Sequence, residues 1–254
     1  TILVHLKNAL LSGSYDYVEI RVAPSDKQIE TVEMGGSIWM AFNARSRDLE
    51  DQVYPLDGTT VEEMYRNGWV SSIGGLFQYG RKYMYTPWQG YNPSNNLGNQ
   101  IADIPWQNDT HMPCPEGYRV PTRSELNSLL PKNQEIPGTY IAGNGEKITA
   151  TLHVGEGTLT TPTGVTGTQP YVKFTSEDTG RYLIIPLAGG KGDKSTTNNP
   201  SFGKRAVLWT SERNGCPGGY AWTYWLPFEG KETTAIAERQ LQMEAFASLR
   251  CVKK

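Results

Sequence analysis

Apolar and polar residues alternate through most of the hydrophobic segments of the chain, and this period of two is typical of half-buried β-strands. Residues 2–6 and 17–22 alternate in this way, with Ser12-Gly13-Ser14 as a turn between them. They predict a β-hairpin over residues 1–23. A lone hairpin is marginal in water, so we expect it to pack on the main domain or on an upstream partner.

Eight later segments are predicted to be further short strands, and we expect the last to be continuous almost to the C-terminus. They are residues 37–41, 75–80, 147–154, 171–176, 182–187, 206–210, 221–226 and 245–252. The chain also contains 27 Gly and 16 Pro, a proportion that favours many turns over a helical bundle.

Two short helices are indicated by their N-terminal signals. Thr122 and Glu125 have the spacing of a capping box and precede a stripe of leucines. Thr59 or Thr60 is placed to cap a second helix at 61–65, whose first turn is acidic. The predicted fold class is therefore α+β, with mostly short antiparallel strands and one or two short helices.

Two long segments, 86–113 and 189–203, lack any regular periodicity and are predicted to be loops; loops of this length are often functional. We expect two units along the chain. The first is the hairpin and a polar joint at 1–30, for which the end of an upstream domain is the alternative interpretation, and the second is a single domain at 31–254.

Charge and hydropathy exclude several classes of function. The 254 residues have a formal net charge of −2, so no electrostatic footprint for nucleic acid is present. No apolar run approaches ~18 residues, so we expect no membrane span in this chain. The first residues, Thr1 to Leu6, have neither the basic region nor the cleavage site of a signal peptide.

Aromatic residues in polar surroundings are the main candidates for ligand binding. Loops present such rings as rigid platforms, or use them as anchors. In the strand at 221–226, Trp222 and Tyr224 share one face and Trp225 takes the other; one face is expected to be core and the other to line a groove. The candidate ligand-binding residues are Trp88, Tyr91, Trp106, Asn108, Trp222 and Tyr224.

Several phrases of the chain, taken in order, resemble a known family, the Fibrobacter succinogenes major paralogous domain. The resemblance covers residues 34–254 and rests on five sequence motifs. They are Ile38-Trp39-Met40-Ala41-Phe42-Asn43; Gly75-Leu76-Phe77-Gln78-Tyr79; Cys114-Pro115-Glu116-Gly117-Tyr118, continued by Pro121-Thr122-Arg123-Ser124-Glu125; Leu208-Trp209-Thr210-Ser211-Glu212; and Ser248-Leu249-Arg250-Cys251-Val252. It implies a C-type-lectin-like fold in which the strand containing Trp39 and the strand containing Cys251 lie close together.

The three cysteines, Cys114, Cys216 and Cys251, permit one disulfide or three buried thiols. The resemblance favours a bridge between Cys114 and Cys251, because both lie in the matching phrases. Cys216 remains a competitor for Cys114, since both begin a Cys-Pro-x-Gly-Tyr phrase.

Metal and enzyme chemistry have weaker signals. Asp103 and Asp109 are the weak metal candidates, as oxygen ligands in a loop near Asn108, but the tripeptides of calcium-dependent sugar-binding lectins are missing. The phrase Pro121-Thr122-Arg123-Ser124-Glu125-Leu126 also resembles one in the formylglycine-generating enzymes, although Thr122 and Glu125 already serve as a helix cap. We expect no cofactor.

The resemblance implies an exported bacterial protein at the cell surface, of the kind found on surface proteins and fimbria-like fibres. We therefore expect a non-enzymatic binding or adhesion module whose partner is a surface glycan or a protein, with recognition through the long loops. The alternative is a structural subunit of a surface fibre, in contact with other subunits and without a small-molecule ligand. A formylglycine-generating-enzyme-like oxidase or other enzyme ranks third.

Overall fold

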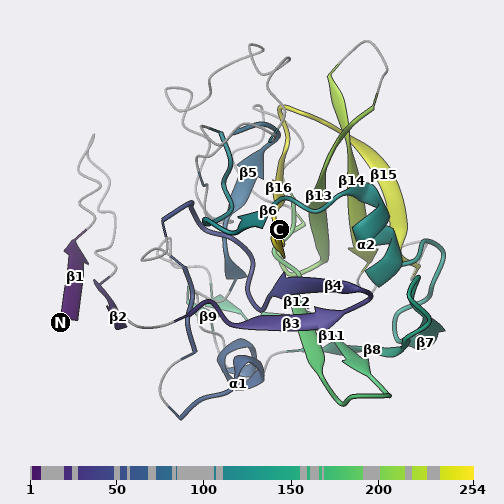
Figure 1. The fold of residues 1–254 in the computed structure, drawn as a ribbon, viewed down its shortest axis with the longest axis horizontal. Coiled ribbons are helices and arrows are strands. Elements are labelled where there is room, and N and C mark those ends of the chain that lie inside the picture. Colours follow the sequence, from purple (N-terminus) through teal and green to yellow (C-terminus); the bar gives the residue numbers. More distant parts are fainter. Residues whose placement is uncertain are drawn as a thin grey trace.

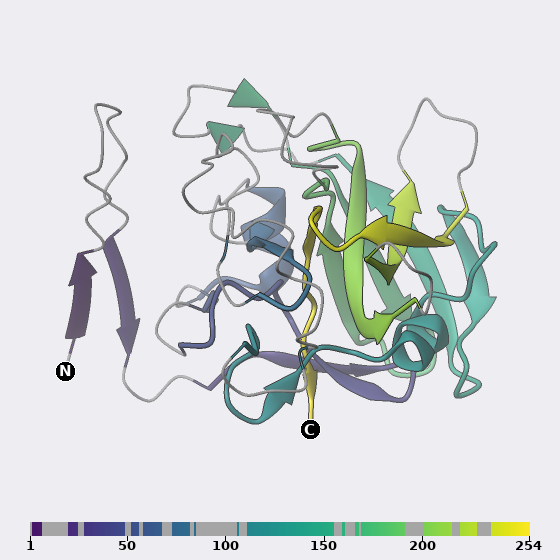
Figure 2. The same cartoon turned by 90° about the horizontal axis from the view of Figure 1, so that it is seen from above.

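Strands in five sheets and two short helices make up the regular structure of the computed structural model (Figures 1 and 2). The residues that it describes are 2–6, 20–24, 28–48, 52–55, 58–67, 73–81, 84, 106, 111–154, 159–160, 166–167, 169–190, 201–214, 219–227 and 235–254. This part of the chain is mostly β, as the periodicity predicts.

One four-stranded sheet, in the order β3-β4-β17-β6, joins the two ends of the main domain. Its strands are β3 (Thr31–Met34), β4 (Ser37–Met40), β17 (Val252–Lys253) and β6 (Tyr118–Arg119). Val252 pairs antiparallel with Trp39, and the backbone N–H of Met40 donates to the carbonyl of Cys251 at 3.0 Å. This confirms the prediction that the strand of Trp39 lies beside the chain at Cys251.

A second four-stranded sheet is antiparallel throughout and has the order β12-β11-β8-β7. Its strands are β7 (Gly138–Ile141), β8 (Lys147–His153), β11 (Tyr171–Ser176) and β12 (Tyr182–Pro186). Three of the four agree with the predicted segments to within a residue. A two-stranded sheet of β9 (Leu159–Thr160) and β10 (Thr166–Gly167) is separate from it.

The largest sheet has five strands in the order β15-β14-β13-β16-β5. They are β5 (Leu76–Gln78), β13 (Arg205–Arg213), β14 (Tyr220–Pro227), β15 (Ala237–Gln242) and β16 (Phe246–Ser248). Strand β13 pairs parallel with β16, and the other pairs are antiparallel.

The prediction of one continuous strand at 245–252 is wrong. The chain leaves the five-stranded sheet after Ser248 and enters another sheet as β17. Between them, Leu249 accepts a backbone hydrogen bond from Ala44 at 2.8 Å, and the fully buried Arg250 reaches across to β12. These tertiary contacts, rather than the local apolar pattern, decide where the strand ends.

Both helices have the capping boxes that their sequences indicate. In α1 (Val61–Arg66) the cap is Thr60, one of the two candidates, and its side chain accepts from the N–H of Glu63. In α2 (Arg123–Leu129) Thr122 and Glu125 cap each other's backbone as predicted.

The five-stranded sheet has hydrophobic core on both faces. The first core lies between this sheet, α2 and the β12-β11-β8-β7 sheet, and it includes Leu208 and Tyr224. The second core lies on the opposite face and includes Trp209 and Ala221. Because β13 and β14 contribute to both cores, their positions are fixed from two sides.

The N-terminal hairpin is confirmed as antiparallel β1 (Ile2–Leu6) and β2 (Ile20–Pro24), with Val4 opposite Val22. Both views show these strands standing apart from the other sheets (Figures 1 and 2). The structure therefore does not show the expected packing on the main domain, and packing on an upstream partner stays a prediction.

Candidate ligand-binding site

Strand β14 places two half-buried tryptophans on opposite faces of the five-stranded sheet. Trp222 lies on the face of the first core, beside α2, and Trp225 packs against the edge of the second core. This follows from the alternation of side chains along a strand. Each indole ring has arginine against it, but the arginines differ in what neutralises them.

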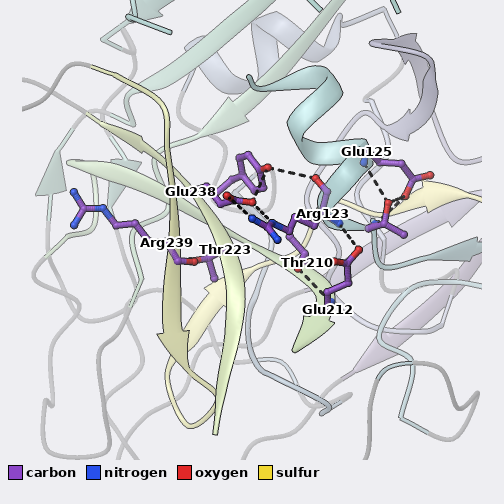
Figure 3. Close-up of polar contacts among 9 residues, drawn as sticks. Arg123, Glu125, Thr210, Glu212, Thr223, Glu238 and Arg239 are labelled. Atoms are coloured by element: carbon purple, nitrogen blue, oxygen red, sulfur yellow. Dashed lines mark hydrogen bonds and ion pairs between the residues drawn. The ribbon is translucent and has the colours of Figure 1, made fainter. Parts of the chain in front are cut away.

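On the first face, Arg123 of α2 lies over the ring of Trp222, with its guanidinium carbon 4.0 Å from the ring centroid. The guanidinium donates to both carboxylate oxygens of Glu238, one at 2.9 Å (Figure 3). The backbone N–H of Arg123 donates to Glu212 at 3.1 Å. The cation is thus paired with a side chain that is only 9% exposed, and the contact clamps α2 onto the sheet.

In this contact between α2 and the sheet, which we call the Arg123–Glu238 clamp, each charged group stabilises the ionised form of its partner. Hydrogen bonding from Arg123 holds the pKa of Glu238 below its ordinary value, and the same bond raises the pKa of Arg123. Burial, followed by the nearby carboxylate, raises the pKa of Tyr224. Tyr224 therefore stays protonated and donates its hydroxyl to Glu238 at 3.2 Å.

The prediction that Tyr224 binds ligand is wrong, because its side chain is 0% exposed and belongs to the first core. The ring of Trp222 is half-buried and already covered by Arg123, which gives it a structural role in the clamp. Sequence reasoning placed the two residues on one face correctly, but that face is the core face.

Trp106 was predicted to be a binding platform in a loop, and its burial shows that this prediction is also wrong. It is 1% exposed, its ring centroid lies 4.7 Å from that of Tyr79, and its indole N–H donates to the carbonyl of Arg81 at 3.1 Å. Trp106 is therefore an anchor in the second core. The other predicted loop residues lie outside the described residues: Trp88, Tyr91, Asn108, Asp103 and Asp109.

On the second face, the strand register gathers two arginines around Trp225. Val207, Trp225 and Ala237 lie directly opposite one another on β13, β14 and β15. Arg205 precedes Val207 by two residues, and Arg239 follows Ala237 by two, so both share the face of Trp225 at diagonal positions. Diagonal neighbours across a sheet are about 7–8 Å apart, within reach of long side chains.

The side chains of both arginines extend to the Trp225 ring. The guanidinium carbons of Arg205 and Arg239 lie 5.0 Å and 5.2 Å from the centroid of the Trp225 ring. Both distances are within the range of cation–π attraction. We call Arg205, Trp225 and Arg239 the Arg–Trp–Arg strip; it crosses three adjacent strands, and Figure 3 shows Arg239 pointing away from the Arg123–Glu238 pair.

The indole ring of the strip is held in a fixed orientation. Its N–H donates to the hydroxyl of Thr223 at 2.8 Å. This hydroxyl donates to the backbone carbonyl of Arg239 at 3.0 Å, and Figure 3 shows Thr223 beside Arg239. Thr223 is itself buried. The ring therefore needs no reordering before it meets a ligand.

The strip has a local excess of positive charge. Within the described residues, neither Arg205 nor Arg239 has a carboxylate at ion-pair distance, whereas Arg123 on the opposite face is bound by Glu238. Arg239 is exposed and Arg205 half-buried. Two partly accessible cations without a counter-ion in the described part of the chain, in a protein of net charge −2, mark this place as the candidate binding site.

Comparison with known proteins assigns the family. The model of the Fibrobacter succinogenes major domain matches residues 32–253. The chain belongs to this family. The matched segment of this Fibrobacter succinogenes major domain begins after the N-terminal hairpin and ends in β17. Neither the search of curated proteins nor the search of solved structures found a match.

The cysteines of this Fibrobacter succinogenes major domain confirm the pairing that the resemblance favours. Cys114 and Cys251 form a disulfide, and both are buried in the second core. The bridge joins residues 137 apart in sequence. Cys216 lies outside the described residues.

In the described part of the domain, no three side chains of His, Cys, Asp or Glu gather as a metal ion would require. Among the same residues, no helix is both long enough and apolar enough to span a membrane.

Proposed function

We propose that this domain is a non-enzymatic binding or adhesion module of the bacterial cell surface and that it has a C-type-lectin-like fold. One observation carries the proposal: two arginines without a carboxylate partner in the described chain flank a half-buried tryptophan, Trp225, on a sheet with core on both faces. Clustered Trp and Arg side chains are the groups that most often dominate binding energy.

The rigid setting of the strip supports a binding role. A ligand gains most from groups that lose little conformational freedom when it binds. Trp225 is fixed by Thr223, and β14 is paired on both sides by β13 and β15. The strip thus differs from a loop site, whose residues must first be ordered.

Two features support the C-type-lectin-like assignment. The early strand β4 and the final strand β17 pair, as the family resemblance implies. The helix after the Cys114 phrase is short and capped by its own Thr122. The assignment concerns the fold alone and implies no calcium.

The oxidase alternative has less support from the phrase that suggested it. Both carboxylate oxygens of Glu125 accept from Arg119, at 2.6 and 2.7 Å, and one also accepts the backbone N–H of Thr122 at 2.8 Å. These contacts give Glu125 a structural role at the start of α2. A reaction would have to use other residues.

The test compares two tryptophans on the same strand. Wild type, Trp225→Ala and the matched control Trp222→Ala are assayed on a glycan array and in a pull-down with bacterial surface proteins, with parallel melting curves. We expect Trp225→Ala to weaken binding by about 2 kcal/mol, as hot-spot truncations do, and Trp222→Ala to lower the melting temperature while binding is retained.

Equal binding by wild type and Trp225→Ala would contradict the proposed site. A wild type that binds nothing on either assay would favour the structural subunit of a surface fibre. The loop residue Trp88 stays a separate prediction: Trp88→Ala in the same assays tests whether the segment 86–113 contributes.

A further inference from the structure

The charge state of the Arg–Trp–Arg strip points to the class of ligand. Both faces of β14 carry arginine on tryptophan, yet among the described residues the face of Trp222 alone supplies a carboxylate partner, Glu238. On that face Glu238 neutralises Arg123, the arginine that holds α2 on the sheet. The two arginines around Trp225 have no such partner among the described residues.

We propose that the strip binds an acidic polysaccharide through its carboxylate or sulfate groups, which rests on the proposed binding function. Guanidinium groups donate two parallel hydrogen bonds to a planar oxyanion, and such charge-assisted bonds are about twice as strong as neutral ones. The ligand supplies the negative charge that the protein supplies itself on the opposite face.

The spacing suits a polymer with repeated charges. The guanidiniums of Arg205 and Arg239 are each about 5 Å from the same ring, so they lie within about 10 Å of each other. Each can bind a different anionic group of one chain. Trp225 lies between them and holds both guanidiniums in place by cation–π attraction.

The position in the sheet favours a polysaccharide over an acidic peptide. An extended peptide gains much of its affinity from backbone hydrogen bonds to a free sheet edge. The strip crosses β13, β14 and β15, and β14 at its centre is paired on both sides. At that centre the backbone groups of β14 are already paired within the sheet, so a ligand contacts side chains. This suits a ligand that is recognised by its charges and its sugar rings.

The experiment uses probes that differ in charge alone. Binding of the whole chain to polygalacturonate and to its fully methyl-esterified form is measured by titration calorimetry at low and at 0.5 M salt. Dextran sulfate and neutral dextran form the sulfate arm, and poly-L-glutamate is the peptide arm. We expect an anionic polysaccharide to bind, its neutral form to bind at least tenfold more weakly, and salt to weaken binding, because exposed charges are screened.

Variants locate the binding. Arg205→Ala and Arg239→Ala should each weaken binding to the anionic probe about tenfold, and the lysine variants should recover only part of it because lysine lacks the planar fork. The control Arg181→Ala removes the same charge from an exposed arginine that is paired with Glu33, and it should bind like wild type.

Each other outcome overturns the inference. Equal binding of charged and neutral forms, or equal loss in Arg181→Ala, would show that Arg205 and Arg239 do not select charge. Preference for poly-L-glutamate would identify an acidic protein as the partner. Binding of only neutral glycans, still lost in Trp225→Ala, would refute the acidic ligand and leave the proposed binding function standing.

Discussion

Arg250 is a buried cation whose partners are all uncharged, and its removal gives the sharpest test of how this fold is held together. Its side chain is 0% exposed. It donates to the side-chain oxygen of Asn43 and the carbonyl of Met40, each at 3.0 Å, to the carbonyl of Ile184 at 2.6 Å, and to the carbonyl of Ala41. It thereby ties the end of β4 to β12.

The replacement Arg250→Met keeps much of the apolar volume but removes the guanidinium donors from four oxygens around this buried side chain. Each unsatisfied buried group costs about 1–3 kcal/mol, while removal of a buried charge returns several kcal/mol of desolvation free energy. Burial also lowers the pKa of Arg250, in accord with this desolvation. The balance gives an expected loss of about 3 kcal/mol in the free energy of unfolding.

The replacement Arg250→Lys separates charge from geometry. An ammonium group has three donors at one point, whereas the four acceptors are spread over two separate segments of the chain, residues 40–43 and β12. We expect it to recover less than half of the lost stability. The assay is urea unfolding, read as a midpoint shift at constant slope, and the control is Arg181→Met, an exposed arginine that should cost less than about 1 kcal/mol.

A wild-type midpoint for Arg250→Met would refute the reasoning, because it would mean that apolar packing alone joins these segments. Full recovery by Arg250→Lys would show that the charge matters and the fork geometry does not. A changed slope would indicate that the variant no longer reaches the same native state.

Three further predictions concern stability. Cys114→Ala with Cys251→Ala should lower the free energy of unfolding by about 5 kcal/mol on the chain-entropy account for a separation of 137 residues, and reducing agent should have the same effect on wild type in urea unfolding. Glu238→Gln should destabilise the domain near neutral pH, and the difference in stability from wild type should be smaller below about pH 4. The pKa of Glu238 is lower in the folded state than in the unfolded state, so its carboxylate adds stability above the unfolded-state pKa and this stability is lost as the pH falls. A stability difference that stays constant from pH 7 to 3 in acid titrations would contradict this. Trp106→Ala should cost about 3–5 kcal/mol in the same urea assay, and an unchanged midpoint would contradict its role as an anchor.

The predictions that succeeded depend on short stretches of sequence. A capping box needs only Thr122 and Glu125, and alternation within 171–176 fixes a strand whatever lies beside it. The division of 245–252 into two strands could not be found this way. It is set by Arg250, which bonds to residues more than sixty positions away.

The candidate site was only partly visible in the sequence because it depends on register. Alternation separated Trp222 from Trp225, but nothing local indicated which face was core. Strand β15 had no predicted counterpart, so the diagonal approach of Arg239 to Trp225 could not be foreseen. The prediction that Trp106 binds ligand failed for another reason: the polar residues around it in the sequence do not indicate whether its own ring is buried.

The two faces of β14 differ in charge because two consecutive residues of β15 have opposite charges and project to opposite faces. Glu238 and Arg239 are consecutive, so they point to opposite faces, and the carboxylate goes to Arg123 while the guanidinium goes to Trp225. A slip of one residue in the pairing of β15 would exchange them. Glu238 would then neutralise the strip and leave the clamp with two like charges. The register that secures α2 is therefore the same register that leaves the strip positive, and the fold and the candidate site are specified together.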